Sequence, residues 1–221
     1  MKKIAFISLL LAASLLNANP IGSNSLNLGE VNTKSQKSLN TIKDYNSLIN
    51  DLKQAASLGD TNSIFYLGVV YLNELTLKDG TKIQPDRVKA MKFLNKAISL
   101  GSEKALSIVA AYCIKDLDVK SMTHTVKIVQ QSPTFNTSDK DYYSMMLASL
   151  ILDTSSLESN SIEVATKWLY KAEKIRPTYK MQYLLASLYS RIKNEKAANY
   201  YLNKSCQAKE MATICKAYKN K

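Results

Sequence analysis

Residues 59–101 read GDTNSIFYLGVVYLNELTLKDGTKIQPDRVKAMKFLNKAISLG and contain two helical patterns separated by a polar loop. In the first half, small and apolar residues recur at spacings of three and four, which places them on one helix face: Ser63, Leu67, Gly68 and Tyr71. The second half repeats this spacing: Asp86, Lys89, Ala90, Phe93, Lys96 and Ala97. Pro85 suits the entry to this helix, and Gly101 tolerates a left-handed conformation at its end. We name the first kind of helix A and the second kind B.

Both patterns return along the chain. The A pattern recurs in three further segments and begins again near the C-terminus: Ala105, Val109, Ala110 and Cys113; Tyr143, Leu147, Ala148 and Ile151; Met181, Leu185, Ala186 and Tyr189; Ile214 and Tyr218. Its central apolar residue steps by 42, 38, 38 and 33 residues, which is the spacing of helical solenoid repeats. The B pattern recurs twice: Ala165, Trp168, Lys171 and Ala172; Ala198, Tyr201, Lys204 and Ser205. Another B helix is expected within 119–131.

The B pattern indicates how the helices pack. A small residue lets two helices approach closely, and the aromatic residue three positions later fills the space beyond it. The aliphatic stem of the lysine lies along the surface, with its charge in water. This pattern predicts that Trp168 is buried. Neither helix can bury its apolar stripe alone, so the pairs must stack on one another.

Composition supports an all-α fold. Of 221 residues, 46% are hydrophobic and 22% are charged, which excludes a disordered chain. Only 6 Gly and 4 Pro are present, too few for the many turns of an all-β protein. With 1 His and 3 Cys, the chain has no ligand set for zinc or haem. We therefore expect no catalytic site, no cofactor and no metal.

The N-terminus resembles a secretion signal. Lys2 and Lys3 precede an apolar run over 4–16, which is shorter than the roughly 20 residues that span a bilayer. We expect a signal peptide at 1–18, a flexible Asn/Ser-rich leader at 19–38, and an α-solenoid domain at 39–221. The mature chain is expected to be periplasmic or secreted, in a Gram-negative bacterium, and not membrane-spanning.

Residues 45–219 resemble the Sel1-like repeat, a relative of the tetratricopeptide repeat with a longer loop. The first unit shows the resemblance best: a glycine, a Leu-Gly pair, a tyrosine, a long loop, two Lys-Ala pairs around an aromatic residue, and a closing glycine. The resemblance implies an α/α superhelical solenoid of stacked antiparallel helix pairs. It also implies a protein-binding scaffold.

The cysteines extend this resemblance. Cys206 and Cys215 lie at the end of the last B helix and inside the final A helix, where a short turn can bring them face to face. Their placement is similar to that in cysteine-rich Sel1 proteins of epsilon-proteobacteria, which implies a disulfide between them. Cys113 takes the position of Tyr71 and Tyr189 in the other A helices. It is either a buried apolar side chain or the site of an intermolecular bridge.

Positive charge gathers in the C-terminal third. Residues 161–221 contain 13 Lys and Arg against 4 Glu, whereas 19–160 contain 15 basic against 14 acidic residues. This third could face an acidic protein, an anionic envelope polymer or lipid headgroups, or it could be an ordinary solvated surface. Nucleic acid is not an expected partner, because no nucleic-acid module is recognisable.

The leading functional prediction is a non-enzymatic exported adaptor that assembles an envelope complex for secretion or motility. By analogy with tetratricopeptide repeats, its partner, an acidic peptide or helix, would contact the A-helix side chains that point away from the buried stripe. We name these residues the predicted groove: Asn62, Phe65, Val69, Lys104, Ser107, Tyr142, Met145, Lys180 and Tyr183. The alternatives are a protein that binds cell wall or anionic polymer, a penicillin-interacting enzyme, and a secreted host-interaction factor.

Overall fold

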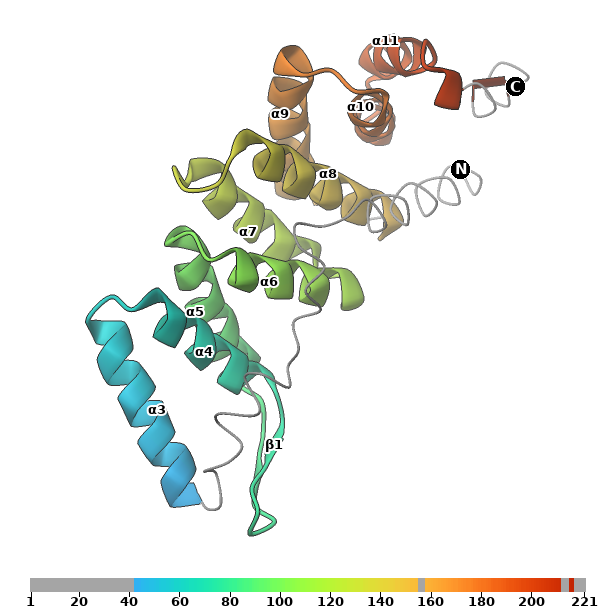
Figure 1. The fold of residues 1–221 in the computed structure, drawn as a ribbon. Coiled ribbons are helices and arrows are strands. Elements are labelled where there is room, and N and C mark those ends of the chain that lie inside the picture. The colour runs from blue at the N-terminus through green and yellow to red at the C-terminus, as the bar shows by residue number, and fades with distance from the viewer. Residues whose placement is uncertain (1–41, 155–157, 212–214, 217–221) are drawn as a thin grey trace. The chain divides into compact units, whose positions relative to one another are not determined.

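The computed structural model describes residues 42–154, 158–211 and 215–216. Nearly all of this part of the chain is helical (Figure 1): α3 (Ile42–Ser57), α4 (Thr61–Leu72), α5 (Arg87–Ser99), α6 (Glu103–Lys115), α7 (Val119–Gln131), α8 (Thr137–Asp153), α9 (Ser159–Ile175), α10 (Tyr179–Arg191), α11 (Glu195–Ser205) and the short 3-10 helix η1 (Lys209–Met211). Helices α4, α6, α8 and α10 are the predicted A helices, and α5, α7, α9 and α11 are the predicted B helices. The expected all-α class, built from antiparallel helix pairs in solenoid order, is confirmed.

Some predictions concern segments that the structure does not describe. The signal peptide at 1–18 and the leader at 19–38 lie outside the described residues, as do Ile214 and Tyr218 of the final A pattern.

The loop between α4 and α5 contains a β-ribbon that the sequence pattern did not predict. Strands β1 (Leu75–Thr76) and β2 (Lys82–Ile83) pair antiparallel, with Leu75 opposite Ile83. The carboxylate of Asp79 accepts a hydrogen bond from the Thr81 backbone N–H at 2.9 Å and closes the turn. Two-residue strands are too short to show an alternating pattern in the sequence, which is why only a loop was predicted.

The described residues fall into two compact units. The N-terminal unit comprises 42–112 and 131–134 and holds α3, α4, α5 and most of α6. The C-terminal unit comprises the other described residues from 113 onward and holds α7 to α11.

Close approach of two helices organises the N-terminal unit, in which α4 packs against α3 and α5. Gly68 of α4 faces Leu94 of α5 so closely that a Cβ built on Gly68 would lie 2.6 Å from the Leu94 Cγ. Beyond this contact the Tyr71 and Phe93 rings stack with centroids 5.8 Å apart. The close approach is therefore made by Gly68 of the A pattern, and Phe93, the aromatic residue of the B pattern, stacks on Tyr71 beside it.

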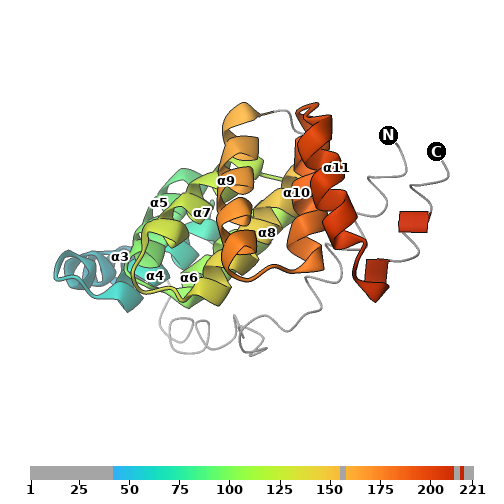
Figure 2. The same ribbon diagram turned by 90° about the horizontal axis from the view of Figure 1, so that it is seen from above.

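The C-terminal unit has a central helix. Helix α8 packs against α9 and α10, and α10 packs in turn against α9 and α11 (Figure 2). All residues of α8 from Tyr143 to Leu152 are buried, as expected of a helix with neighbours on several sides. Polar contacts hold α7 in place: Thr123 Oγ1 lies 2.8 Å from Ser161 Oγ of α9, and Gln130 Nε2 donates to Ser144 Oγ of α8 at 2.8 Å.

Trp168 corrects one prediction, because it is only half-buried. Helix α9 packs through Ala165, Leu169 and Ala172, which are almost fully buried, and the indole lies on the flank of that stripe. The Lys171 Nζ lies over the face of this ring, 4.5 Å from its centroid.

Four helix ends share one junction, in which a residue with positive φ is followed at once by the N-cap of the next helix: Gly59–Asp60, Gly101–Ser102, Leu117–Asp118 and Lys193–Asn194. At the last of these, the Asn194 backbone N–H donates to the Tyr189 carbonyl at 2.9 Å, and the Asn194 side chain accepts from the Ala197 N–H at 3.1 Å. Such a junction reverses the chain within two residues. At the first one, hydrogen bonds from Ser63 hold the pKa of the Asp60 carboxyl below its usual value.

Replacing Gly68 by Ala is expected to destabilise the protein, although alanine favours helix. The new methyl group would overlap the buried Leu94 side chain, and overpacking of this kind costs about 1–3 kcal/mol. Urea unfolding measures the change in the free energy of unfolding. In a double-mutant cycle with Leu94→Ala, the two losses should sum to more than the loss in the double variant. Additive losses would contradict the close contact.

Replacing Lys193 by Gly is expected to raise the free energy of unfolding by about 0.5–1 kcal/mol. Lys193 has φ of 60°, a left-handed conformation that costs about 1 kcal/mol or more for a residue with a Cβ. Lys193→Ala is the matched control, since it removes the charge and keeps the Cβ, and it should give no gain. An equal gain in both variants would show that charge, and not backbone strain, is responsible.

Candidate functional site

The predicted groove residues divide by exposure. In the N-terminal unit Asn62, Lys104 and Ser107 are exposed, while Phe65 and Val69 are buried. In the C-terminal unit Tyr142 and Lys180 are half-buried, while Met145 and Tyr183 are buried. The exposed and half-buried residues are available for contact with a partner, and their role in binding stays a prediction.

Packing of the C-terminal segment explains why Tyr183 is buried. Tyr183, Met211 and Cys215 form one buried cluster, and Tyr179 and Leu202 pack against it. Met211 and Cys215, which follow α11, therefore lie against the A helix α10, on the face where the groove was expected to continue. Tyr183 contributes to this core and not to an open surface.

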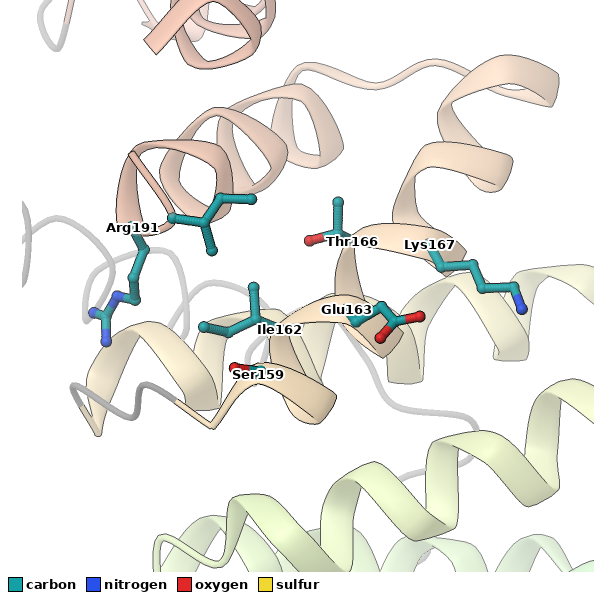
Figure 3. Close-up of a pocket in the computed structure, with 7 residues that line it drawn as sticks. Ser159, Ile162, Glu163, Thr166, Lys167 and Arg191 are labelled. Atoms are coloured by element: carbon teal, nitrogen blue, oxygen red, sulfur yellow. The ribbon is translucent and has the colours of Figure 1, made fainter. Parts of the chain in front are cut away.

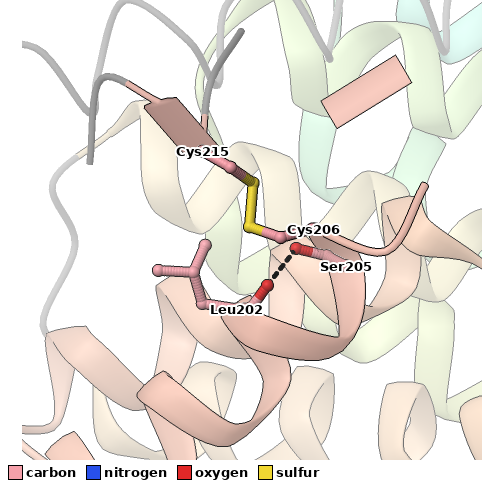
Figure 4. Close-up of a disulfide and its surroundings, with 4 residues drawn as sticks. All are labelled: Leu202, Ser205, Cys206 and Cys215. Carbon is pink, nitrogen blue, oxygen red and sulfur yellow. Dashed lines mark hydrogen bonds between the residues drawn. A yellow bond between two sulfur atoms is a disulfide. The ribbon is translucent and has the colours of Figure 1, made fainter. Parts of the chain in front are cut away.

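A disulfide holds this segment. Cys206, the C-cap of α11, is joined to Cys215, and the Cα atoms of the two residues are 5.9 Å apart (Figure 4). Beside it the Ser205 hydroxyl donates to the Leu202 carbonyl at 2.8 Å in the last turn of α11. The predicted pairing is confirmed. Cys113 is not part of this disulfide and is fully buried, as expected if it is an apolar side chain of the core.

A buried carboxylate connects the last three full helices, and sequence reasoning missed it. Glu173 of α9 is only 3% exposed, and its Oε1 accepts from Gln182 Nε2 of α10 at 3.2 Å and from Lys204 Nζ of α11 at 2.9 Å. Burial, with a smaller effect of the Glu173 charge, raises the pKa of Tyr201 well above its ordinary value. The sequence does contain a pattern that could have indicated this buried carboxylate, because Glu173 follows Leu169 at helical spacing on an otherwise apolar stripe.

A second acidic group lies where α8 ends. Burial raises the pKa of the Asp153 carboxyl, and the positive charge of Arg191 only partly offsets this effect. The Asp153 Oδ1 and the Ser149 Oγ, one turn earlier on α8, are buried with no hydrogen-bond partner among the described residues. The Arg191 guanidinium donates to the carbonyls of Ile151 and Leu152 at 3.2 Å and 2.9 Å. Arg191 thus satisfies the C-terminal carbonyls of α8.

An open depression of about 520 Å³ lies between the N-terminal half of α9 and the C-terminal end of α10 (Figure 3). Its lining mixes apolar, polar and charged side chains: Ser159, Ile162, Glu163, Thr166, Lys167, Arg191 and Ile192. Arg191 of this lining is engaged by the α8 carbonyls, and Lys167 is its other basic residue. In the described part of the chain, no group of three His, Cys, Asp or Glu side chains could bind a metal ion.

No helix within 42–154, 158–211 or 215–216 has the length and hydropathy needed to cross a bilayer. Searches of family models, curated proteins and solved structures found no match to this sequence. The Sel1-like resemblance therefore rests on the residues quoted above and stays a prediction.

Loss of the disulfide is expected to lower the free energy of unfolding by about 2.5–3 kcal/mol. The bond joins residues 9 apart in sequence, and the chain-entropy model gives roughly this value for a loop of that size. Thermal unfolding of the Cys206→Ser/Cys215→Ser variant measures the loss. The same reductant that lowers the midpoint of the parent chain should leave the variant unchanged. A parent midpoint insensitive to reductant would contradict a stabilising role.

Proposed function

We propose that this chain is a non-enzymatic exported scaffold of the Sel1-like kind, which binds a protein partner along its A helices. The observation that supports the proposal is that Tyr142 and Lys180, equivalent residues of two repeats, stay partly exposed on α8 and α10. These helices pack side by side within the C-terminal unit. Repetition of equivalent positions on adjacent helices is how solenoids build extended binding surfaces.

The chemistry of the available residues favours an acidic peptide or helix. Within the C-terminal unit, Lys180 supplies positive charge and Tyr142 supplies an aromatic surface. Burial raises the pKa of Tyr142, so its hydroxyl stays protonated and can donate to a carboxylate. We infer a partner within an envelope complex for secretion or motility.

Export is supported by the disulfide. Bonds of this kind form and persist in oxidising compartments such as the bacterial periplasm or the extracellular medium. Cys206 and Cys215 are paired while Cys113 is enclosed in the core, a distribution typical of a protein that folds outside the cytoplasm.

The enzymatic alternative has less support. Ser190 and Lys193 have the Ser-x-x-Lys spacing of penicillin-interacting enzymes, but both residues are exposed at the end of α10. Acylation needs a nucleophile positioned beside a base and an oxyanion site, and an exposed helix end does not hold a lysine against a serine in this way. Binding of cell-wall polymer and a role toward a host stay predictions.

Selection of displayed peptides against the purified chain tests the scaffold proposal. We expect enriched peptides to be rich in Asp and Glu, and to lose at least tenfold in affinity for the Tyr142→Ala/Lys180→Glu variant. The matched control is Tyr66→Ala/Lys92→Glu in the N-terminal unit, which makes the same changes in residue type. Selected peptides that bind the groove variant as well as the parent chain, or that lose equally on the control, would refute the assignment of the groove.

A further inference from the structure

A second surface lies on the B helices of the C-terminal unit, and it is independent of the proposed groove. We name it the lysine–tyrosine face and define it by six residues of α9 and α11: Tyr170, Lys171, Lys174, Ile175, Lys196 and Tyr200. Its apolar members are unusually open to solvent, since Tyr170 is 41% exposed, Tyr200 is 54% exposed and Ile175 is 71% exposed.

The two helices present these residues together. The Lys204 Nζ of α11 lies 2.9 Å from the Glu173 Oε1 of α9, which brings the C-terminal parts of the two helices together. The same Lys204 Nζ lies 5.2 Å from the centroid of the Tyr200 ring, which places Tyr200 near Glu173 of α9. Residues 171, 174 and 175 share one side of α9, and Lys196 and Tyr200 share one side of α11.

Within the described residues, the lysines of this face have no carboxylate in an ion pair with them. Among the described ion pairs none involves Lys171, Lys174 or Lys196. Lys171 and Lys174 are one turn apart, where like charges repel and destabilise the helix. Their ammonium groups lie over aromatic rings, since the Lys174 Nζ is 5.4 Å from the Tyr170 centroid and the Lys171 Nζ is 4.5 Å from that of Trp168. Such a face is stabilised by an anionic surface that neutralises it.

The chemistry of the face favours a lipid surface over a protein. Tyrosine rings with polar tips, lysines whose stems lie along apolar surface, and an exposed isoleucine are the side chains that suit the boundary between headgroups and acyl chains. Clustered lysines are attracted to anionic lipids.

We propose that the lysine–tyrosine face docks this chain onto the surface of a bilayer that contains anionic phospholipid. The docking is peripheral and reversible, with the lysines at the phosphates and Tyr170, Tyr200 and Ile175 in the headgroup layer.

The single tryptophan of the chain provides a local reporter. Trp168 is the only Trp in the sequence, and its half-buried ring lies beside Lys171. The full chain, purified after export from an expressing bacterium, is titrated with vesicles of phosphatidylcholine mixed with phosphatidylglycerol, and with vesicles of phosphatidylcholine alone. We expect the emission of Trp168 to shift to the blue with the anionic vesicles only, and the shift to weaken as salt is added.

Two variants separate charge from insertion, with vesicle flotation as a second measurement. Lys171→Gln/Lys174→Gln/Lys196→Gln should lose roughly a hundredfold in affinity, at roughly fivefold for each lysine near an anionic membrane. Tyr170→Ser/Tyr200→Ser should lose affinity for vesicles but not for soluble polyglutamate. Lys92→Gln/Lys96→Gln/Lys115→Gln removes the same charge from exposed positions of α5 and α6 and should bind nearly as tightly as the parent chain. Circular dichroism checks that each variant is folded.

Several results would overturn the proposal. They are the absence of binding to anionic vesicles, equal binding to phosphatidylcholine alone, and an equal loss in the Lys92 control variant. Tighter binding to polyglutamate or to single-stranded DNA than to the vesicles, with no effect of the tyrosine variant, would assign the face to an acidic macromolecule instead. None of these results depends on whether peptides bind the groove.

Discussion

The structure depends on mutual burial between neighbouring helices, because no helix of this chain can hide its apolar face alone. The contact of Gly68 with Leu94 shows the constraint at its tightest, since the backbone of α4 approaches α5 to a distance that even a methyl group would prevent. In the C-terminal unit, α8 is buried along ten successive residues because helices pack on it from several sides. Repeat proteins of this type gain stability from each interface between neighbours.

Because burial depends on neighbouring helices, the last helices need further residues to cover their apolar side chains. Helix α10 would expose Tyr183 if nothing followed α11, and the segment joined through Cys206 and Cys215 covers it. The Glu173 carboxylate adds a polar connection among α9, α10 and α11 in the same region. A buried carboxylate is tolerated only with its partners in place, so this network also fixes how the three helices align.

The arrangement separates two kinds of surface. A helices are enclosed by their neighbours and present few side chains, among them Tyr142 and Lys180, which suits recognition of an extended peptide. B helices α9 and α11 turn a broader side outward, where lysines surround exposed tyrosines. A scaffold that binds a partner on one surface and an anionic bilayer on the other would hold that partner at the membrane.

Local features of the sequence were enough to determine the helices. Apolar spacing placed α4, α6, α8 and α10 and the B helices α5, α9 and α11, and Gly101 marked the end of α5, because periodicity and helix termination depend on residues close together in the chain. The pairing of Cys206 with Cys215 was likewise predictable through its resemblance to a known placement.

Which side of a helix is covered was decided only by the tertiary structure. Phe65 and Tyr183 were expected in a groove and are buried, while Trp168 was expected in the core and is half-exposed. The tertiary structure also showed two features that the sequence analysis did not predict, the β-ribbon between α4 and α5 and the Glu173 network. The physical reason is that burial of a side chain depends on residues from distant segments, and a helical period gives the direction of a side chain but not what lies opposite it.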